Sequence, residues 1–120
     1  MIGTSKFENL VINETFRLVE QETGFSREVL ISRLRKNEVV SARFIAIYVV
    51  KKLTRLSLKS IGTVFNRDHS SIIHALAEVS IWSETPHRYI AEMIMLEKIT
   101  TAVGASLEIE SRGMTQKAFT

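Results

Sequence analysis

The stretch SLKSIGTVFNRDHSSIIHA, residues 57–75, has the pattern of a short helix, a tight turn and the start of a longer helix. Ser57 is a residue type that caps helix N-termini, and the apolar residues after it have helical spacing. Asn66-Arg67 is the predicted turn, because asparagine tolerates the left-handed backbone conformation. Either Asp68 or His69 caps the second helix. Two helices joined this closely predict a helix-turn-helix.

Helical spacing of apolar residues continues on both sides of this stretch, and only one proline and five glycines interrupt the chain. Ser5 and Glu8 have the spacing of a capping box. The expected helices run from Ser5 to Thr23-Gly24, from Ser26 over Val29 and Leu30, from Asn37 as cap to about Leu53, from Ser57 to Phe65, from Asp68 or His69 to about Ser83, and from Thr85-Pro86 to Gly104.

No strand pattern, internal repeat or linker accompanies these helices, which predicts an all-α fold, a compact bundle of about six helices. We expect one domain over residues 1–104, with the helix-turn-helix at about 57–83. Residues 105–120 are expected to form a flexible tail with Leu107 and Ile109 as its apolar residues. The predicted core residues are Phe7, Leu10, Val11, Leu18, Ala42, Ile45, Ala46, Val49, Leu53, Leu58, Ile61, Phe65, Ile73, Leu76, Ala77, Ile90, Ile94 and either Leu96 or Met93. Ile72, Val79 and Trp82 are expected near this core, and Arg43 lies off the core stripe.

The composition excludes several kinds of protein. The chain has 120 residues and no cysteine, which excludes disulfides, thiolate metal sites and cysteine catalysis. The longest apolar run, residues 44–50, is far shorter than the ~20 residues of a membrane-spanning helix. The N-terminus lacks the pattern of a secretory signal, so we expect a cytoplasmic protein without a membrane partner.

Positive charge is concentrated in the middle of the chain. The formal net charge is only +3, yet residues 33–67 contain nine basic residues and one acidic residue. A stretch of one sign repels itself, and it is typical of a surface that binds a polyanion. We therefore favour nucleic acid as the partner over an acidic membrane or an acidic protein surface.

The start of the longer helix carries the side chains best suited to reading bases. Asp68, His69, Ser70, Ser71 and His74 are polar groups that donate or accept hydrogen bonds, and a helix-turn-helix places such residues at base edges in the major groove. For Asp68 the alternative is a helix cap alone, and for the histidines it is an incidental polar surface. A metal site or a serine hydrolase is disfavoured, because no third ligand, orienting carboxylate or Gly-rich elbow accompanies these residues.

Three stretches resemble the C-terminal DNA-binding domain of the bacterial replication initiator DnaA. RDHSSIIHA, residues 67–75, is similar to the family's Gly-Gly-Arg-Asp-His-Thr-Thr-Val-(Leu/Ile)-His-Ala. ARFIAIY, residues 42–48, resembles its Arg-Gln-(Ile/Met)-Ala-Met-Tyr helix, and residues 57–65 resemble its Ser-Leu-x-x-Ile-Gly-x-x-Phe. The resemblance covers about residues 5–85 and implies a Trp-repressor-like helical domain that binds short asymmetric origin boxes in duplex DNA.

The resemblance also implies roles for single residues. Arg35 matches an arginine that enters the minor groove, and Arg43 matches one at the major-groove side. Three further cations are assigned to phosphates on charge alone: Lys52, Arg55 and Lys59. The expected DNA-binding residues are thus Arg35, Arg43, Lys52, Arg55, Lys59, Arg67, Asp68, His69, Ser70, Ser71 and His74. No catalytic residue, metal or cofactor is expected.

The sequence also departs from the family pattern. Phe44 stands where the family has glutamine, and it is either a packed residue, which we favour, or an apolar contact to a thymine methyl. Ser70 and Ser71 replace threonines, and the turn is one residue shorter. The ATPase region of the initiator has no counterpart in these 120 residues, so we expect a stand-alone protein.

These expectations combine into one function and one alternative. The favoured function is sequence-specific binding of a DnaA-box-like site on the nucleoid, regulating DNA replication initiation or transcription. The alternative is an interaction or dimerisation module. In it the last helix, with Met93 and Met95 exposed, binds a second copy or a replication protein, and DNA binding is secondary.

Overall fold

The fold is a bundle of α-helices. The computed structural model describes residues 5–119, with side chains described for 5–108, and has six helices and no strand within that part of the chain. They are α1 (Lys6–Thr23), α2 (Arg27–Leu30), α3 (Asn37–Leu53), α4 (Leu58–Phe65), α5 (His69–Glu84) and α6 (Ile90–Phe119). The predicted all-α bundle of about six helices is confirmed.

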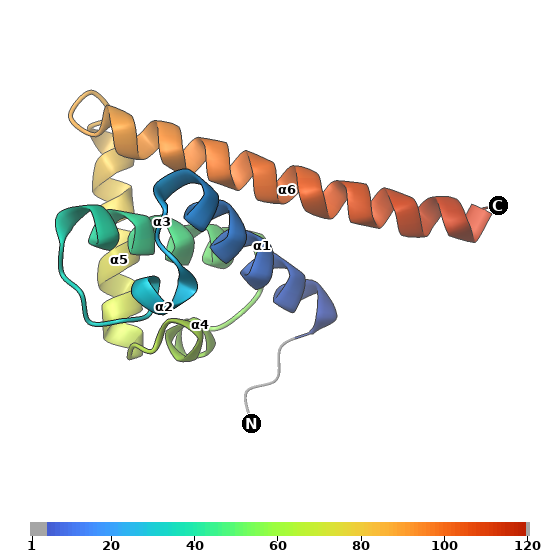
Figure 1. Cartoon of the computed structure of the whole chain (residues 1–120), viewed down its shortest axis with the longest axis horizontal. Coiled ribbons are helices and arrows are strands. Elements are labelled where there is room, and N and C mark those ends of the chain that lie inside the picture. The colour runs from blue at the N-terminus through green and yellow to red at the C-terminus, as the bar shows by residue number, and fades with distance from the viewer. Residues whose placement is uncertain (1–4, 120) are drawn as a thin grey trace.

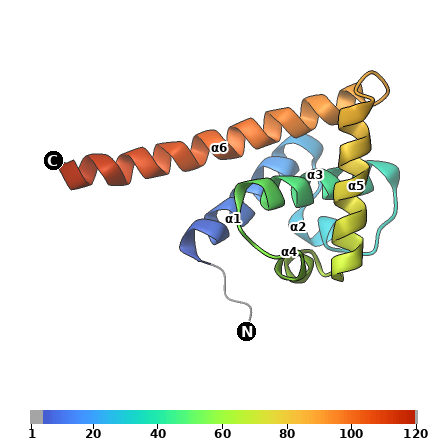
Figure 2. The same ribbon diagram turned by 180° about the vertical axis from the view of Figure 1, so that it is seen from behind.

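Helix α3 lies at the centre of the fold, where it packs against each of the other five helices (Figure 1). Helix α5 packs across α3 at a steep angle and leads into α6, which crosses the bundle beside α1. The view from behind shows the end of α6 projecting past the start of α1 (Figure 2). This arrangement leaves α4, the start of α5 and the loop after α2 together on one side of the molecule.

Buried apolar side chains from all six helices form a single core. The rings of Phe16 and Phe65, whose centroids are 5.2 Å apart, join α1 to α4 at its centre. Burial of each large apolar side chain stabilises the fold by about 1.5–3 kcal/mol. The most completely buried of these residues are Val11, Val19, Leu30, Val39, Ile47, Val49, Val50, Ile61, Phe65, Ile72, Val79 and Ile99.

Most helix ends follow the sequence signals. The Ser5 hydroxyl accepts from the Glu8 N–H while the Glu8 carboxylate accepts from the Ser5 N–H, as a capping box requires. Gly24 ends α1 in the left-handed conformation with φ of 81°, a conformation that glycine adopts without steric cost. Asn37 differs from the expectation, because Lys36 is the N-cap of α3 and its side chain makes no cap hydrogen bond.

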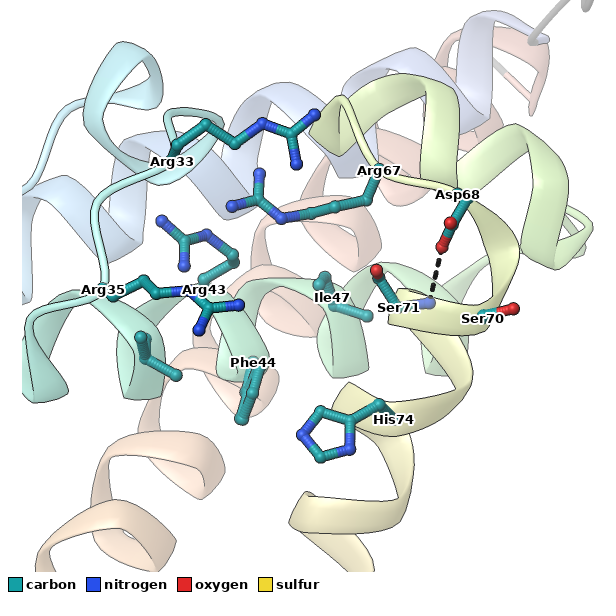
Figure 3. A pocket seen from close by; sticks show the side chains of 11 residues that line it. Arg33, Arg35, Arg43, Phe44, Ile47, Arg67, Asp68, Ser70, Ser71 and His74 are labelled. Atoms are coloured by element: carbon teal, nitrogen blue, oxygen red, sulfur yellow. Dashed lines mark hydrogen bonds between the residues drawn. The ribbon is translucent and has the colours of Figure 1, made fainter.

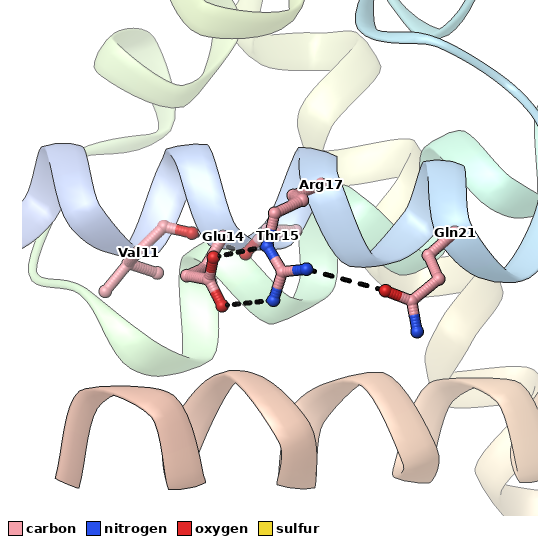
Figure 4. A network of polar contacts seen from close by, with 5 residues as sticks. All are labelled: Val11, Glu14, Thr15, Arg17 and Gln21. Atoms are coloured by element: carbon pink, nitrogen blue, oxygen red, sulfur yellow. Dashed lines mark hydrogen bonds and ion pairs between the residues drawn. The ribbon is translucent and has the colours of Figure 1, made fainter. Parts of the chain in front are cut away.

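A polar network on the outer side of α1 faces α6 (Figure 4). Arg17 binds the carboxylate of Glu14 through two hydrogen bonds of 2.7 and 2.9 Å, and this bond holds the pKa of Glu14 below its ordinary value. Lys98 of α6 forms an ion pair of 2.9 Å with Glu22 near the end of α1. Exposed pairs of this kind contribute little to stability, so apolar packing holds the two helices together.

Helix α5 turns a different stripe toward the core from the one predicted. The buried residues are Ile72, Ala75, Val79 and Trp82, whereas Ile73 and Ala77 are exposed and Leu76 is half-buried. Apolar residues occupy both stripes, so helical spacing alone does not decide which one faces α3. The predicted burial of Ile73 and Ala77 is therefore wrong.

The ends of α1 and α6 also differ from the predictions. Phe7 and Leu10 are exposed at the start of α1, and Ile90 and Ile94 are exposed on α6, because the first turns of both helices lie at the edge of the bundle. Leu96, Ile99 and Val103 are the residues of α6 that enter the core, while Leu53, Met93, Met95 and Leu107 are half-buried against it. The exposure of Met93 and Met95 assumed in the interaction-module alternative is therefore wrong, whereas the predicted burial of Leu96 is confirmed.

Helix α6 begins later and ends later than its sequence signals indicate. Thr85 is the C-cap of α5, and the helix begins at Ile90 rather than at Pro86. The predicted helix end at Gly104 is wrong, because Gly104 keeps helical geometry and the helix runs to Phe119. The domain boundary at residue 104 stays a prediction, and the side chain of Ile109 lies outside the described residues. In the described part of the chain, no helix combines the length and apolarity needed to cross a bilayer.

Candidate nucleic-acid interface

A groove of about 600 Å³ lies between the loop after α2 and the N-terminal half of α5 (Figure 3). Its floor comes from α3, its cations from the loop, α3 and the turn before α5, and its polar wall from α5. The lining residues are Arg33, Arg35, Val40, Arg43, Phe44, Ile47, Arg67, Asp68, Ser70, Ser71 and His74. The groove thus brings together seven of the eleven predicted DNA-binding residues.

The turn between α4 and α5 has the conformation that its sequence predicts. Asn66 adopts the left-handed conformation with φ of 57°, and the N–H of Arg67 donates to the carbonyl oxygen of Gly62 at 2.8 Å. A Cβ atom at Gly62 would collide with the backbone carbonyl oxygen of Arg67. The absence of a side chain at Gly62 therefore allows α4 to approach the start of α5 this closely.

Asp68 is the N-cap of α5. Its carboxylate accepts a hydrogen bond of 2.9 Å from the backbone N–H of Ser71, and this bond lowers the pKa of Asp68, with the charges of His69 and Arg33 acting in the same direction. The carboxylate is therefore ionised at neutral pH and lies at the edge of the groove, beside a helix N-terminus that favours negative charge. Asp68 rather than His69 is the cap.

The first turns of α5 expose the predicted polar side chains. Ser70, Ser71 and His74 are exposed and line the groove, and His69 is exposed at the first residue of the helix, outside the groove lining. None of the four is buried in the core, so each is accessible to a molecule that docks on this side of α5.

Phe44 of α3 is half-buried and lies at the floor of the groove against His74 (Figure 3). The two rings meet edge to face, with centroids 5.9 Å apart and planes at 81°. The Phe44 ring also lies 6.4 Å from that of Trp82. Phe44 is thus a packed residue, as favoured from the sequence, and it supports the imidazole of His74 from below.

Arg43 is buried, with only 4% of its surface exposed, although the sequence places it off the core stripe. Its Nε donates to the carbonyl oxygen of Leu30 at 2.6 Å, and its Nη2 donates to those of Ser32 and Leu34 at 3.2 and 3.0 Å. These three bonds fix the loop after α2. They also give the guanidinium nitrogens hydrogen-bond partners, which offsets the cost of burying a charged group. The predicted exposure of Arg43 is wrong because the loop folds over it.

Arg67 makes similar contacts from the other side of the loop. Its guanidinium donates to the carbonyl oxygens of Ile31, Ser32 and Phe65, at 3.2, 2.6 and 2.8 Å. Burial lowers the pKa of Arg43 to about 10, with the charge of Arg67 adding to the effect, and burial together with Arg33 lowers the pKa of Arg67. The guanidinium groups therefore repel each other, and the carbonyl oxygens between them offset this repulsion.

The remaining predicted cations lie away from the groove. Lys52 and Arg55 line a separate cavity with Ser5 and Phe7 at the start of α1, and Lys59 is exposed on α4. Lys52 also lies 5.8 Å from the centre of the Tyr48 ring. The structure therefore does not bring these three residues together with the arginines of the groove.

Arg33 is a groove residue that is not among the residues predicted to bind DNA. It is exposed in the loop after α2, lines the groove and lies close enough to influence the pKa of both Arg67 and Asp68. The feature of the sequence that points to Arg33 is its position beside Arg35 in the basic loop. Within residues 5–108, no three potential ligands among His, Asp and Glu are placed to hold a metal ion.

Comparison with known proteins gives one family. Residues 12–79 match the family model of the bacterial DnaA protein helix-turn-helix. The chromosomal replication initiator protein DnaA of Thermus thermophilus is 40% identical over 73 residues, covering 60% of this chain and 17% of that protein. The same protein of Oleidesulfovibrio alaskensis is 44% identical over 68 residues (53% and 15%), and that of Agrobacterium fabrum is 32% identical over 80 residues (66% and 16%).

This chain thus spans about a sixth of the length of the curated relatives it matches. The matched region extends from α1 into α5 and contains α4, the turn after it and most of α5, together with every residue that lines the groove. Because the family model covers more than half of the chain, the chain belongs to the bacterial DnaA helix-turn-helix family.

Proposed function

We propose that the chain binds duplex DNA in a sequence-specific manner, and that it regulates replication initiation or transcription by occupying a DnaA-box-like site on the nucleoid. One observation carries this proposal. Four arginines converge with the polar start of α5 on a single groove, where Asp68 is the only acidic lining residue. A surface with this chemistry attracts phosphates and offers hydrogen bonds to bases.

The start of α5 enters the major groove in this proposal. A recognition helix approaches bases with its N-terminal residues, and here these residues are His69, Ser70, Ser71 and His74, all of them exposed. Serine hydroxyls and imidazole nitrogens donate to or accept from several base edges. Phe44 restricts the rotation of His74 and so limits the directions in which its imidazole can bind.

The loop after α2 meets the neighbouring minor groove. Arg35 is exposed in this loop and its side chain is directed toward the groove of the protein (Figure 3). The narrow minor groove of A·T-rich DNA has an enhanced negative potential that attracts arginine. Arg35 therefore reads minor-groove width, while one sugar–phosphate strand passes between the loop and α5.

Arg43 and Arg67 act by positioning in this proposal. Their donors already bind the carbonyl oxygens of residues 30–34 and 65, so they hold the loop at a fixed distance from α5. Arg33, exposed at the rim, makes the nearest phosphate contact. Lys52, Arg55 and Lys59 lie outside the groove and contribute long-range attraction to the polyanion rather than a defined contact.

Selection from a pool of random duplex DNA, read by sequencing, tests the proposal. The expected result is enrichment of one short asymmetric motif by the chain, and loss of about 1–3 kcal/mol of binding free energy to that motif in His69→Ala and Arg35→Ala. The matched control is Arg17→Ala on α1, which leaves binding unchanged because Arg17 lies outside the groove. A pool that emerges without an enriched motif contradicts sequence-specific binding.

A second function is favoured by the apolar start of α6. Ile90 and Ile94 are 57% and 62% exposed one helical turn apart, which suits an apolar contact with a second copy of the chain. Sedimentation equilibrium of the chain and of Ile94→Glu tests this alternative. A dimer that Ile94→Glu dissociates supports self-association, and a monomer at every concentration contradicts it.

A further inference from the structure

The outward side of α5 includes an isoleucine among its polar residues. Ser70, Ile73, His74 and Ala77 have the i, i+3, i+4, i+7 spacing of a single helix face, and all four are exposed. Ile73 is 49% exposed, because Ile72 and Ala75 fill the space between α5 and α3. A single exposed isoleucine is ordinary on a protein surface. What distinguishes Ile73 is its position on the face that carries the base-reading residues.

The apolar group available to Ile73 in the major groove is the C5-methyl group of thymine. Ser70 and Ser71 offer hydroxyl groups and no methyl group, so they do not make that contact themselves. Ile73 lies one turn from Ser70, about 4.5 Å further along the helix axis. The sequence therefore places an apolar side chain within the part of α5 that reaches base edges.

We propose that Ile73 is a specificity-determining residue that contacts the C5-methyl group of a thymine in the recognised site, with Ala77 extending the apolar surface. This inference rests on the proposed DNA-binding function. It assigns to the recognition helix a selectivity for thymine over cytosine that the hydroxyl groups of Ser70 and Ser71 do not provide.

Replacement of thymine by uracil in the selected duplex removes only the methyl group and tests the contact directly. Each thymine is replaced in turn, and the affinity of the full chain is measured by fluorescence anisotropy. At one position, replacement of thymine by uracil is expected to lower the affinity of the wild-type chain about fourfold, which corresponds to the free energy of burying one methyl group. At the same position Ile73→Ala is expected to bind the thymine and uracil duplexes equally, while Ile73→Val keeps most of the discrimination.

Ile81→Ala is the matched control, since Ile81 is 43% exposed on the same helix but lies about 12 Å further from its N-terminus. It is expected to keep the fourfold discrimination. If Ile73→Ala discriminates as well as the wild type, or if every uracil duplex binds as tightly as its thymine counterpart, the role of Ile73 is overturned. If the wild-type chain binds selected and scrambled duplexes equally, the proposed function itself fails, and the inference fails with it.

Discussion

The guanidinium of Arg67, in the turn before α5, donates a hydrogen bond of 2.6 Å to the carbonyl oxygen of Ser32, 35 residues earlier in the chain. The same carbonyl oxygen accepts a second bond, of 3.2 Å, from Arg43 of α3. One backbone oxygen thus connects the basic loop, the central helix and the turn of the helix-turn-helix. The distance between Arg35 and the start of α5 depends on these contacts.

Arg67→Lys tests whether the guanidinium fork holds the loop. Lysine keeps the charge but cannot reach three carbonyl oxygens with fixed planar geometry. Because hydrogen bonds to charged groups are each worth about 1.5–3 kcal/mol, we expect a loss of about 2 kcal/mol in the free energy of unfolding, measured with urea. Amides of residues 31–35 exchange faster in the variant. Arg17→Lys, on the exposed side of α1, is the control, and equal exchange in all three proteins would contradict the role of Arg67.

Two glycine substitutions are expected to have opposite effects on stability. Gly62→Ala forces the backbone of the α4–α5 turn to move, because the new Cβ meets the carbonyl oxygen of Arg67, and we expect a loss of about 1–3 kcal/mol. Gly104→Ala places a Cβ in open space within α6 and is expected to gain about 1 kcal/mol from helix propensity. Urea unfolding of both variants measures the difference. A stabilised Gly62→Ala would show that α4 and α5 are less closely joined.

Asp68→Asn separates the charge of the cap from its hydrogen bond. The pKa of Asp68 is lowered from its ordinary value of 3.8, so its ionised form stabilises the folded state above that value, and this contribution is lost as the pH falls through the lowered pKa. Asparagine also caps helices but does not titrate. Thermal unfolding from pH 7 to pH 2 should therefore show the wild type more stable than Asp68→Asn at every pH above the ordinary pKa of 3.8, with the difference disappearing as the carboxylate is protonated at lower pH. A difference in Tm that persists at the lowest pH would assign the effect to something other than ionisation.

Salt dependence distinguishes a phosphate contact from a structural arginine. Each neutralised phosphate contributes about −0.9 to the slope of log affinity against log salt concentration. Arg33→Ala is expected to make this slope about 0.9 less steep, since Arg33 is exposed at the rim of the groove. Arg17→Ala should leave the slope unchanged. An unaltered slope in Arg33→Ala would remove Arg33 from the phosphate contacts.

The local signals in the sequence predict much of this fold. The capping box at Ser5, the left-handed residues Gly24 and Asn66, and the caps at Ser57 and Asp68 all depend on residues within a few positions of one another. Such short-range chemistry is readable without a tertiary structure. The end of α6 is different, because Gly104 keeps helical geometry inside α6 and Leu107 beyond it packs against the bundle, a contact between distant parts of the chain that no local signal predicts.

The sequence predicts the separate segments of the candidate site but not the contacts that bring them together. The basic loop and the polar start of α5 were evident from residue types and from the resemblance to the DnaA family. The burial of Arg43 depends on carbonyl groups 9 to 13 residues away, and the position of the half-buried Arg67 depends on carbonyl groups 35 and 36 residues away, which no local pattern reveals. The sequence does not predict the exposure of Ile73, because α5 has two apolar stripes and either could face the core.

The most direct measurement is NMR mapping of the selected duplex on the ¹⁵N-labelled chain. If DNA occupies the groove, the largest shifts at equimolar duplex fall on the amides of residues 33–36 and 68–77, and residues 90–103 of α6 change little. Large shifts confined to α6, with the groove amides unmoved, would contradict this placement of DNA and favour the interaction through Ile90 and Ile94.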